Sequence, residues 1–114
     1  MAERANVLAA LGLNPYSQSP GEEYMSEPMR THFDKVLTAW SSQVQTELET
    51  TGNTYDLLPL TRRIRKSLLM LDHPVTDYGY CPSCGEQIGV RRLEQDPVAE
   101  LCADCQMLVD MRTP

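Results

Sequence analysis

Four cysteines in two Cys-x-x-Cys pairs constrain this 114-residue chain more than any other feature. Cys81 and Cys84 form one pair, Cys102 and Cys105 form the other, and seventeen residues lie between them. Two residues between thiolates let one turn present both sulfur atoms to one ion, and Zn²⁺ takes four such ligands in a tetrahedron at about 2.3 Å. Because four thiolates leave no position for a substrate, the pattern predicts one structural zinc ion (Zn2+) and no catalytic metal.

The alternatives to zinc are two disulfides, free thiols or a redox-active pair. The apolar run at residues 7–11 is too short for a signal peptide, and no A-x-A cleavage site follows it. We therefore expect a cytoplasmic protein, and in a reducing compartment cysteines bind metals more often than they form disulfides. A thioredoxin-like site requires a βαβ context that this sequence lacks. We also expect the N–H of Gly85 to fold back toward a sulfur atom.

Two amphipathic segments precede the cysteines. In residues 27–50 and again after a break at 50–54, apolar side chains recur at intervals of three and four, the spacing of one helix face. Ser26 is the expected N-cap of the first helix, with Pro28 in its first turn, and Asp56 is the expected cap of the second, which ends at residues 72–74. The stripes are Met29, Phe33, Val36, Leu37, Trp40, Val44 and Leu48, then Leu57, Leu60, Ile64, Leu68 and Leu71.

These patterns predict a mainly α fold with three parts. Residues 1–26 form an N-terminal lead-in that packs on the globular part, through Val7, Leu8, Leu11 and Leu13. Residues 27–73 form an antiparallel two-helix coiled-coil hairpin whose apolar stripes face each other. Residues 74–114 form a small globular domain, a four-cysteine (C4-type) zinc finger with a short C-terminal helix at 103–112. The finger has too few apolar residues for a core of its own, so metal binding is expected to fold it.

Charge and motifs exclude several classes of function. The formal net charge is −6 and the sequence pI is about 4.8, which argues against binding duplex DNA through its phosphates. No apolar run approaches the roughly 20 residues of a membrane-spanning helix. The sequence has no Ser/His/Asp set, no Gly-rich phosphate loop and no HExxH, so we expect no enzyme. His32 and His73 are expected at the surface or as caps, and Trp40 in the core.

Six of the ten basic residues cluster in the sequence. In an acidic protein such a cluster indicates either contact with a polyanion or an acidic protein groove, or a solvated helix flank, and the sequence leaves both open. The six are Arg62, Arg63, Arg65, Lys66, Arg91 and Arg92.

Two blocks of sequence resemble a known family. The first block holds NPY at residues 14–16, PGEEYM at 20–25, HF at 32–33 and LTAW at 37–40. The second holds YGYCxxCG at 78–85, IGVRRLE at 88–94 and LCxDC at 101–105. On these residues the chain is similar to the DksA/TraR C4-type zinc-finger regulators of bacterial RNA polymerase.

The resemblance implies a fold and a mechanism. Family members have a zinc-stapled globular part and a protruding coiled coil, and they bind RNA polymerase directly rather than a promoter. The coil enters the secondary channel, and binding modulates initiation in the stringent response, often with the alarmone ppGpp. The resemblance thus implies that Arg62, Arg63, Lys66, Arg91 and Arg92 are candidates for polymerase or alarmone contacts.

Two departures from the family pattern carry predictions. The arm of the family is longer by roughly two dozen residues, and its tip bears an Asp-Pro-x-Asp-x-Ala motif that residues 44–58 lack. A dozen residues fewer per helix shortens the reach by about 18 Å, so the chain is expected to dock but not to reach the active site. Arg63 matches a sensor position, but Asp96 and Gln106 stand where positive side chains are expected, which predicts weak or absent ppGpp binding.

Two other functions remain open at this point. One is a zinc-ribbon module that binds another protein or nucleic acid, and the other is a thiol oxidoreductase with an exposed thiol of low pKa. The sequence does not specify the target promoters, activation or repression, a natural or engineered origin of the short hairpin, or the oligomeric state.

Overall fold

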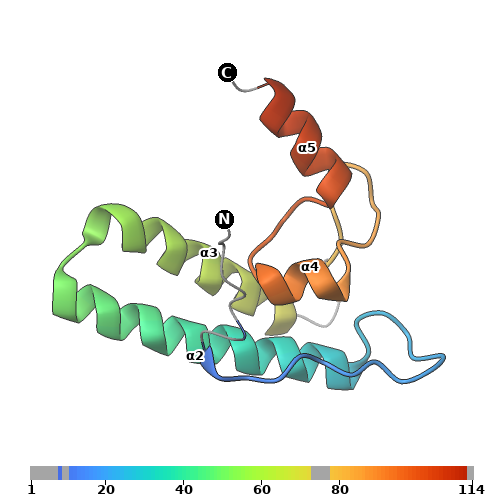
Figure 1. Cartoon of the computed structure of the whole chain (residues 1–114), viewed down its shortest axis with the longest axis horizontal. Helices are drawn as coiled ribbons and strands as arrows, with labels where there is room; N and C mark the ends of the chain where they lie inside the picture. The colour runs from blue at the N-terminus through green and yellow to red at the C-terminus, as the bar shows by residue number, and fades with distance from the viewer. Residues whose placement is uncertain (1–7, 9–10, 73–77, 113–114) are drawn as a thin grey trace.

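The computed structural model describes residues 8, 11–72 and 78–112. The helices of this part are α2 (Glu27–Thr51), α3 (Thr54–Asp72), α4 (Val90–Gln95) and α5 (Ala103–Arg112), as Figure 1 shows. Among the same residues the only extended pairing is an isolated antiparallel bridge between Tyr80 and Gln87. The mainly α class is therefore confirmed. Val7, His73 and Pro74, on which the sequence analysis made predictions, lie outside the described residues.

Helix α2 begins at Glu27, where its sequence predicts, and ends at Thr51, one residue later than expected. The Ser26 hydroxyl accepts a hydrogen bond from the Met29 N–H at 3.4 Å, and Pro28 lies in the first turn. At the other end Gly52 adopts the left-handed conformation, with φ of 69°, and its N–H donates to the Leu48 carbonyl at 2.8 Å. Only glycine adopts this conformation without a steric penalty, so Gly52 fixes the turn between the helices.

Helix α3 begins before the cap that we expected. Asp56 is not the cap, because the helix starts at Thr54 and Asn53 occupies the capping position. The Asn53 side-chain oxygen accepts from the Asp56 N–H at 3.3 Å, and its amide donates to the Asp56 carboxylate at 3.0 Å. The left-handed Gly52 turns the chain so tightly that the next residue already caps the next helix, an effect that intervals between apolar residues do not reveal.

The two long helices lie side by side and antiparallel (Figure 1). Buried side chains of both apolar stripes belong to one core cluster. Trp40 and Leu48 are half-buried and pack against the shared core, as expected for Trp40. This confirms the hairpin. The buried side chains of the stripes are Met29, Phe33, Val36, Leu37 and Val44 from α2, and Leu57, Ile64, Ser67 and Leu71 from α3.

The hairpin and the cysteine-containing segment share one core. Phe33 is completely buried, and its ring lies 6.1 Å from that of Tyr78, centroid to centroid. Helix α4 packs over the base of the hairpin (Figure 1), and this arrangement supplies the apolar partners that the finger lacks by itself. The same cluster contains Tyr78, Cys81, Ile88, Leu93, Val98 and Ala99 together with the α2 and α3 stripes.

The lead-in is attached through Leu8 and through one carboxylate. Leu8 is buried at 1% exposure, so this side chain lies against other residues of the chain. The Glu22 carboxylate accepts hydrogen bonds from the Tyr16 and Ser26 hydroxyls and from the Ser19 N–H, the last at 2.9 Å. Because Ser26 is also the cap of α2, Glu22 connects the lead-in to the start of the hairpin.

The Glu22 network predicts a pH-dependent contribution to stability. The Ser26 hydroxyl first, then the Tyr16 hydroxyl, lowers the pKa of Glu22 below its ordinary value of 4.5. A lowered pKa in the folded state stabilises the fold above pH 4.5, and this contribution is lost as the pH falls through the lowered pKa. Glu22→Gln should therefore lower the urea midpoint at neutral pH, and the gap to wild type should narrow in acid. A gap independent of pH would contradict this origin.

Candidate metal centre

The first cysteine pair lies on a tight knuckle. The N–H of Cys81 donates to the Glu86 carbonyl at 2.8 Å, and the N–H of Gly85 donates to the Cys81 carbonyl at 2.7 Å. Gly85 has φ of +79°, so the residue is needed for the turn as expected. Its N–H, however, bonds a carbonyl and not a sulfur atom, because the turn closes on the backbone of Cys81. The knuckle leaves Cys81 buried and Cys84 exposed.

The second pair lies at the beginning of α5. Cys102 directly precedes the helix and Cys105 lies in its first turn, with its N–H donating to the Cys102 sulfur at 3.5 Å. The N–H of Gln106 also donates to the Cys102 carbonyl, at 2.9 Å. Unpaired N–H groups at a helix N-terminus favour negative charge, so the start of α5 is a suitable place for negatively charged metal ligands.

The four sulfur atoms converge on one point. All of them lie within 4.8 Å of one another. A tetrahedron with Zn–S distances of about 2.3 Å places its sulfur atoms roughly 3.8 Å apart, and those of Cys84 and Cys102 are 3.6 Å apart. That separation is far from the disulfide length of about 2.05 Å, and all four cysteines are free. The donor set therefore fits zinc, and the disulfide alternative is not what the structure shows.

In the crowded cluster of thiols, the pKa values of Cys81 and Cys105 shift in opposite directions. The N–H of Cys102 lowers the pKa of Cys81 to about 6, whereas the sulfur atoms of Cys102 and Cys81 raise the pKa of Cys105 to about 12. Four crowded sulfur atoms cannot all ionise beside one another, and a divalent cation removes that repulsion. With four thiolate ligands, the ion supplies a structural crosslink between the knuckle and α5.

Tyr24 of the lead-in and Tyr78 of the finger support the knuckle, a role that the sequence pattern did not indicate. The Tyr24 hydroxyl donates to the Gly79 carbonyl at 2.8 Å and accepts from the Gly89 N–H at 3.0 Å. The buried Tyr78 hydroxyl donates to the Pro97 carbonyl at 2.7 Å, and burial raises its pKa. The only signal in the sequence was the YGY run itself, which precedes Cys81 directly.

Gly79 is a position where a side chain should not fit. Its φ is +88°, and an added Cβ would lie 2.9 Å from both the Tyr24 hydroxyl and the Met25 methyl carbon. We expect Gly79→Ala to destabilise the fold by about 2 kcal/mol in urea unfolding, through strain and crowding together. Gly21→Ala is the matched control, because Gly21 also has positive φ but nothing within 4 Å. Equal losses for the two variants would rule out the crowding.

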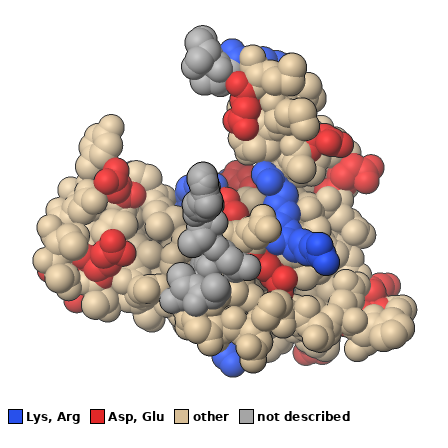
Figure 2. Space-filling model, in the orientation of Figure 1, with Lys and Arg blue, Asp and Glu red and all other residues tan. Residues whose placement is uncertain are grey.

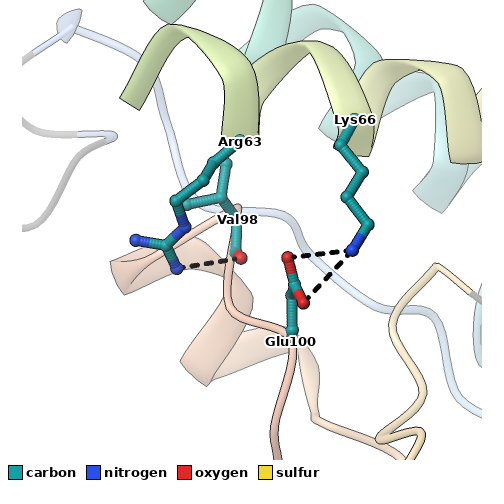
Figure 3. Close-up of polar contacts among 4 residues, drawn as sticks. All are labelled: Arg63, Lys66, Val98 and Glu100. Carbon is teal, nitrogen blue, oxygen red and sulfur yellow. Dashed lines mark hydrogen bonds and ion pairs between the residues drawn. The ribbon is translucent and has the colours of Figure 1, made fainter. Parts of the chain in front are cut away.

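The structure divides the basic cluster. Figure 3 shows Arg63 and Lys66 extending from α3 toward residues 98–100: Arg63 donates to the Val98 carbonyl at 3.4 Å, and Lys66 to both Glu100 carboxylate oxygens at 3.4 Å. The Lys66–Glu100 pair is solvent-exposed, so it adds about 1 kcal/mol at most. These two side chains connect α3 to the finger.

The remaining arginines, on α3 and α4, differ in how far they are exposed and in whether they bond the backbone. Arg92 is half-buried and its Nε donates to the Leu101 carbonyl at 3.0 Å. Arg91, Arg62 and Arg65 are exposed. Figure 2 shows a ridge of basic atoms crossing the region of α4. The surface therefore offers a partner Arg91, Arg62 and Arg65 more readily than Arg63, Lys66 or Arg92.

His32 is not a surface or capping residue. Its side chain is 16% exposed and lies against the rings of Tyr16 and Phe33, with Nε2 3.6 Å from a Glu94 carboxylate oxygen. Burial lowers the pKa of His32, although Glu94 opposes this shift. The lead-in covers this face of α2, because the Tyr16 N–H donates to Glu94.

No helix in the described part of the chain is long and apolar enough to cross a membrane.

Comparison with known proteins decides the family. Residues 77–109 match the prokaryotic dksA/traR C4-type zinc finger. The chain is 35% identical over 135 residues to the RNA polymerase-binding transcription factor DksA of Escherichia coli K12 and to that of Salmonella typhimurium. Each alignment covers 94% of this chain and 88% of the relative. The chain belongs to the DksA/TraR family. A DksA from Buchnera aphidicola subsp. Schizaphis graminum is also 35% identical, over 133 residues.

Membership in the DksA/TraR family assigns the metal and fixes how much of the relatives this chain matches. The C4 finger of the family and the four converging sulfur atoms together give one structural zinc ion. The alignment with the E. coli protein has 135 positions, whereas 94% of 114 residues is about 107, so about 28 positions have no residue from this chain.

Proposed function

We propose that this chain is a transcription regulator that binds bacterial RNA polymerase directly and modulates initiation, without enzymatic activity and without recognising promoter DNA. One observation carries the proposal: 35% identity over 94% of the chain to factors that are named for binding RNA polymerase. The net charge of −6 supports a protein partner over a nucleic acid. Since the polymerase works in the cytoplasm, the protein acts there.

The proposed site on the polymerase is the secondary channel, which the family resemblance implies. A 25-residue α2 is a rod of about 37 Å, and a rod that is rigid before binding loses little conformational entropy when it enters a channel. The residues at its end, Thr51, Asn53 and Thr54, lack the family's tip motif. We therefore propose a blunted regulator, which occupies the channel without acting at the active site.

Two assays test this function. The zinc-loaded chain should co-migrate with RNA polymerase on gel filtration and should not shift naked promoter DNA on a gel. In transcription from a ribosomal promoter, it should relieve the effect of a longer-armed DksA while having little effect by itself. Absence of co-migration would reject the polymerase as partner, and strong inhibition by this chain alone would reject the blunted tip.

The region that matches the family's ppGpp sensor site is unfavourable to a polyphosphate in this chain. Arg63 contacts the Val98 carbonyl, and the Asp96 carboxylate accepts from the Val98 N–H at 3.4 Å, so a negative charge lies beside the one matching cation. Gln106 is neutral and donates to Asp110 at 3.0 Å.

We therefore expect ppGpp to change polymerase regulation by this chain less than about twofold. Titration of ppGpp into a transcription reaction is the measurement. Asp96→Arg should increase the response, and micromolar synergy with the unmodified chain would contradict the prediction.

A further inference from the structure

The end of the hairpin presents an aromatic side chain to solvent. Tyr55, in the first turn of α3, is 88% exposed, which is the highest value among the large apolar side chains of the described residues. Leu58 lies three residues further along the same helix and is also exposed, at 36%, whereas Leu57 is buried against α2. Residues three apart share a helix face, so Tyr55 and Leu58 form an apolar pair that points away from α2. We call this pair the tip anchor.

The backbone under the tip anchor is held in place. The N–H of Gly52 bonds the Leu48 carbonyl, and the N–H of Thr54 bonds the Gly52 carbonyl, both at 2.8 Å. Asn53 and Asp56 bond each other through both side chain and backbone. A fixed backbone presents the ring with little conformational entropy left to lose, which favours binding through it.

Pro59 leaves the backbone carbonyl of Tyr55 without its usual helical hydrogen-bond donor. Proline has no N–H, so it offers no helical hydrogen bond to the carbonyl of Tyr55, four residues before it. A carbonyl at an exposed helix start can accept a hydrogen bond from a partner's side chain. The Tyr55 carbonyl therefore lacks its usual helical donor and points along α3 toward Pro59.

The charges around the tip anchor have one sign. No Lys or Arg occurs between Lys35 and Arg62, whereas Glu47, Glu49 and Asp56 lie in that stretch. Figure 2 shows acidic atoms and no basic atoms at the end of the hairpin on the face in view. Carboxylates around an exposed ring repel phosphate groups and attract a basic protein surface, which speeds association with the correct partner.

We propose that the tip anchor, Tyr55 with Leu58, inserts into a groove of RNA polymerase that is apolar at its floor and lined by Lys or Arg. This inference rests on the proposed function and adds the contact that the shortened arm makes. Tyrosine is among the residues that dominate protein interfaces, because its ring buries a large area and its hydroxyl remains hydrogen-bonded. Aromatic insertion, not a tip carboxylate, is then the main contact of this arm.

Binding of variants to purified RNA polymerase tests the tip anchor. The full zinc-loaded chain carries Tyr55→Ala, Tyr55→Phe or, as the matched control, Leu69→Ala, since Leu69 is 63% exposed on the same helix but remote from the tip. We expect Tyr55→Ala to raise Kd at least about tenfold, Leu69→Ala to change it less than about twofold, and Tyr55→Phe to fall between them. Zinc content and helical circular dichroism should remain those of wild type.

A charge-reversal variant tests the basic groove. Glu47→Lys combined with Glu49→Lys should slow association with the polymerase at low salt, and the difference should shrink at high salt. Equal Kd for Tyr55→Ala and Leu69→Ala, in a chain that binds, would overturn the tip anchor and leave the proposed function intact. Absence of binding by wild type would overturn both. A dimer that is lost in Tyr55→Ala would assign the tip to a second copy of this chain and would also overturn the proposal.

Discussion

Replacing Cys84 with serine should release the zinc ion and lower the thermal midpoint by on the order of 15 °C. Cys84 is exposed, so its replacement by serine removes little apolar burial. Any large loss of stability must therefore come from the metal. Apparent binding free energies of structural zinc are about 10–16 kcal/mol, and losing even about 3 kcal/mol shifts the midpoint of a domain this small by roughly that amount.

The readouts are zinc per chain by native mass spectrometry and unfolding followed by circular dichroism. Glu86→Gln is the matched control, because Glu86 is exposed two residues after Cys84 and carries no thiol. We expect one zinc ion per chain in wild type and in the control. A Cys84→Ser chain that retains stoichiometric zinc and an unchanged midpoint would show that the fourth ligand is not needed and that the site is not a closed C4 centre.

The features that sequence predicted correctly depend on neighbouring residues. The Ser26 cap and the helix at 103–112 each follow from interactions within one or two turns. The four cysteines are the exception, because their two pairs lie far apart in the sequence. They were predictable because metal coordination requires specific residue types at short spacings within each pair. Asp56 was wrong as the cap because the start of α3 depends on where the preceding turn ends.

Features that depend on contacts distant in sequence were not predictable. Lys66 is positive in any pattern, but its contact with Glu100 across 34 residues requires the finger to lie against α3. His32 similarly looked like a polar residue of an exposed face, yet the lead-in and Glu94 cover it. A periodic stripe identifies the face that meets the neighbouring helix, but it does not identify what covers the flanks.

The junction between hairpin and finger should be the most sensitive part of the core. Phe33 is 0% exposed, belongs to the cluster that α2 and α3 share, and lies against the Tyr78 ring of the finger. We expect Phe33→Ala to cost about 3–5 kcal/mol, since it removes a whole buried ring and leaves a cavity. Tyr55→Ala is the matched control: it deletes an aromatic ring that is 88% exposed and should change the free energy of unfolding by less than about 0.5 kcal/mol.

The Phe33→Ala variant also separates the contribution of the shared core from that of the zinc ion. Phe33 supplies no ligand to the metal, and the variant keeps all four cysteines. The variant should therefore still bind one zinc ion per chain at neutral pH. If the shared core couples hairpin and finger, we expect urea unfolding by circular dichroism to show one transition for wild type and two for Phe33→Ala. A single, merely shifted transition would show instead that the remaining contacts between hairpin and finger suffice for cooperative unfolding, with Phe33 adding only stability.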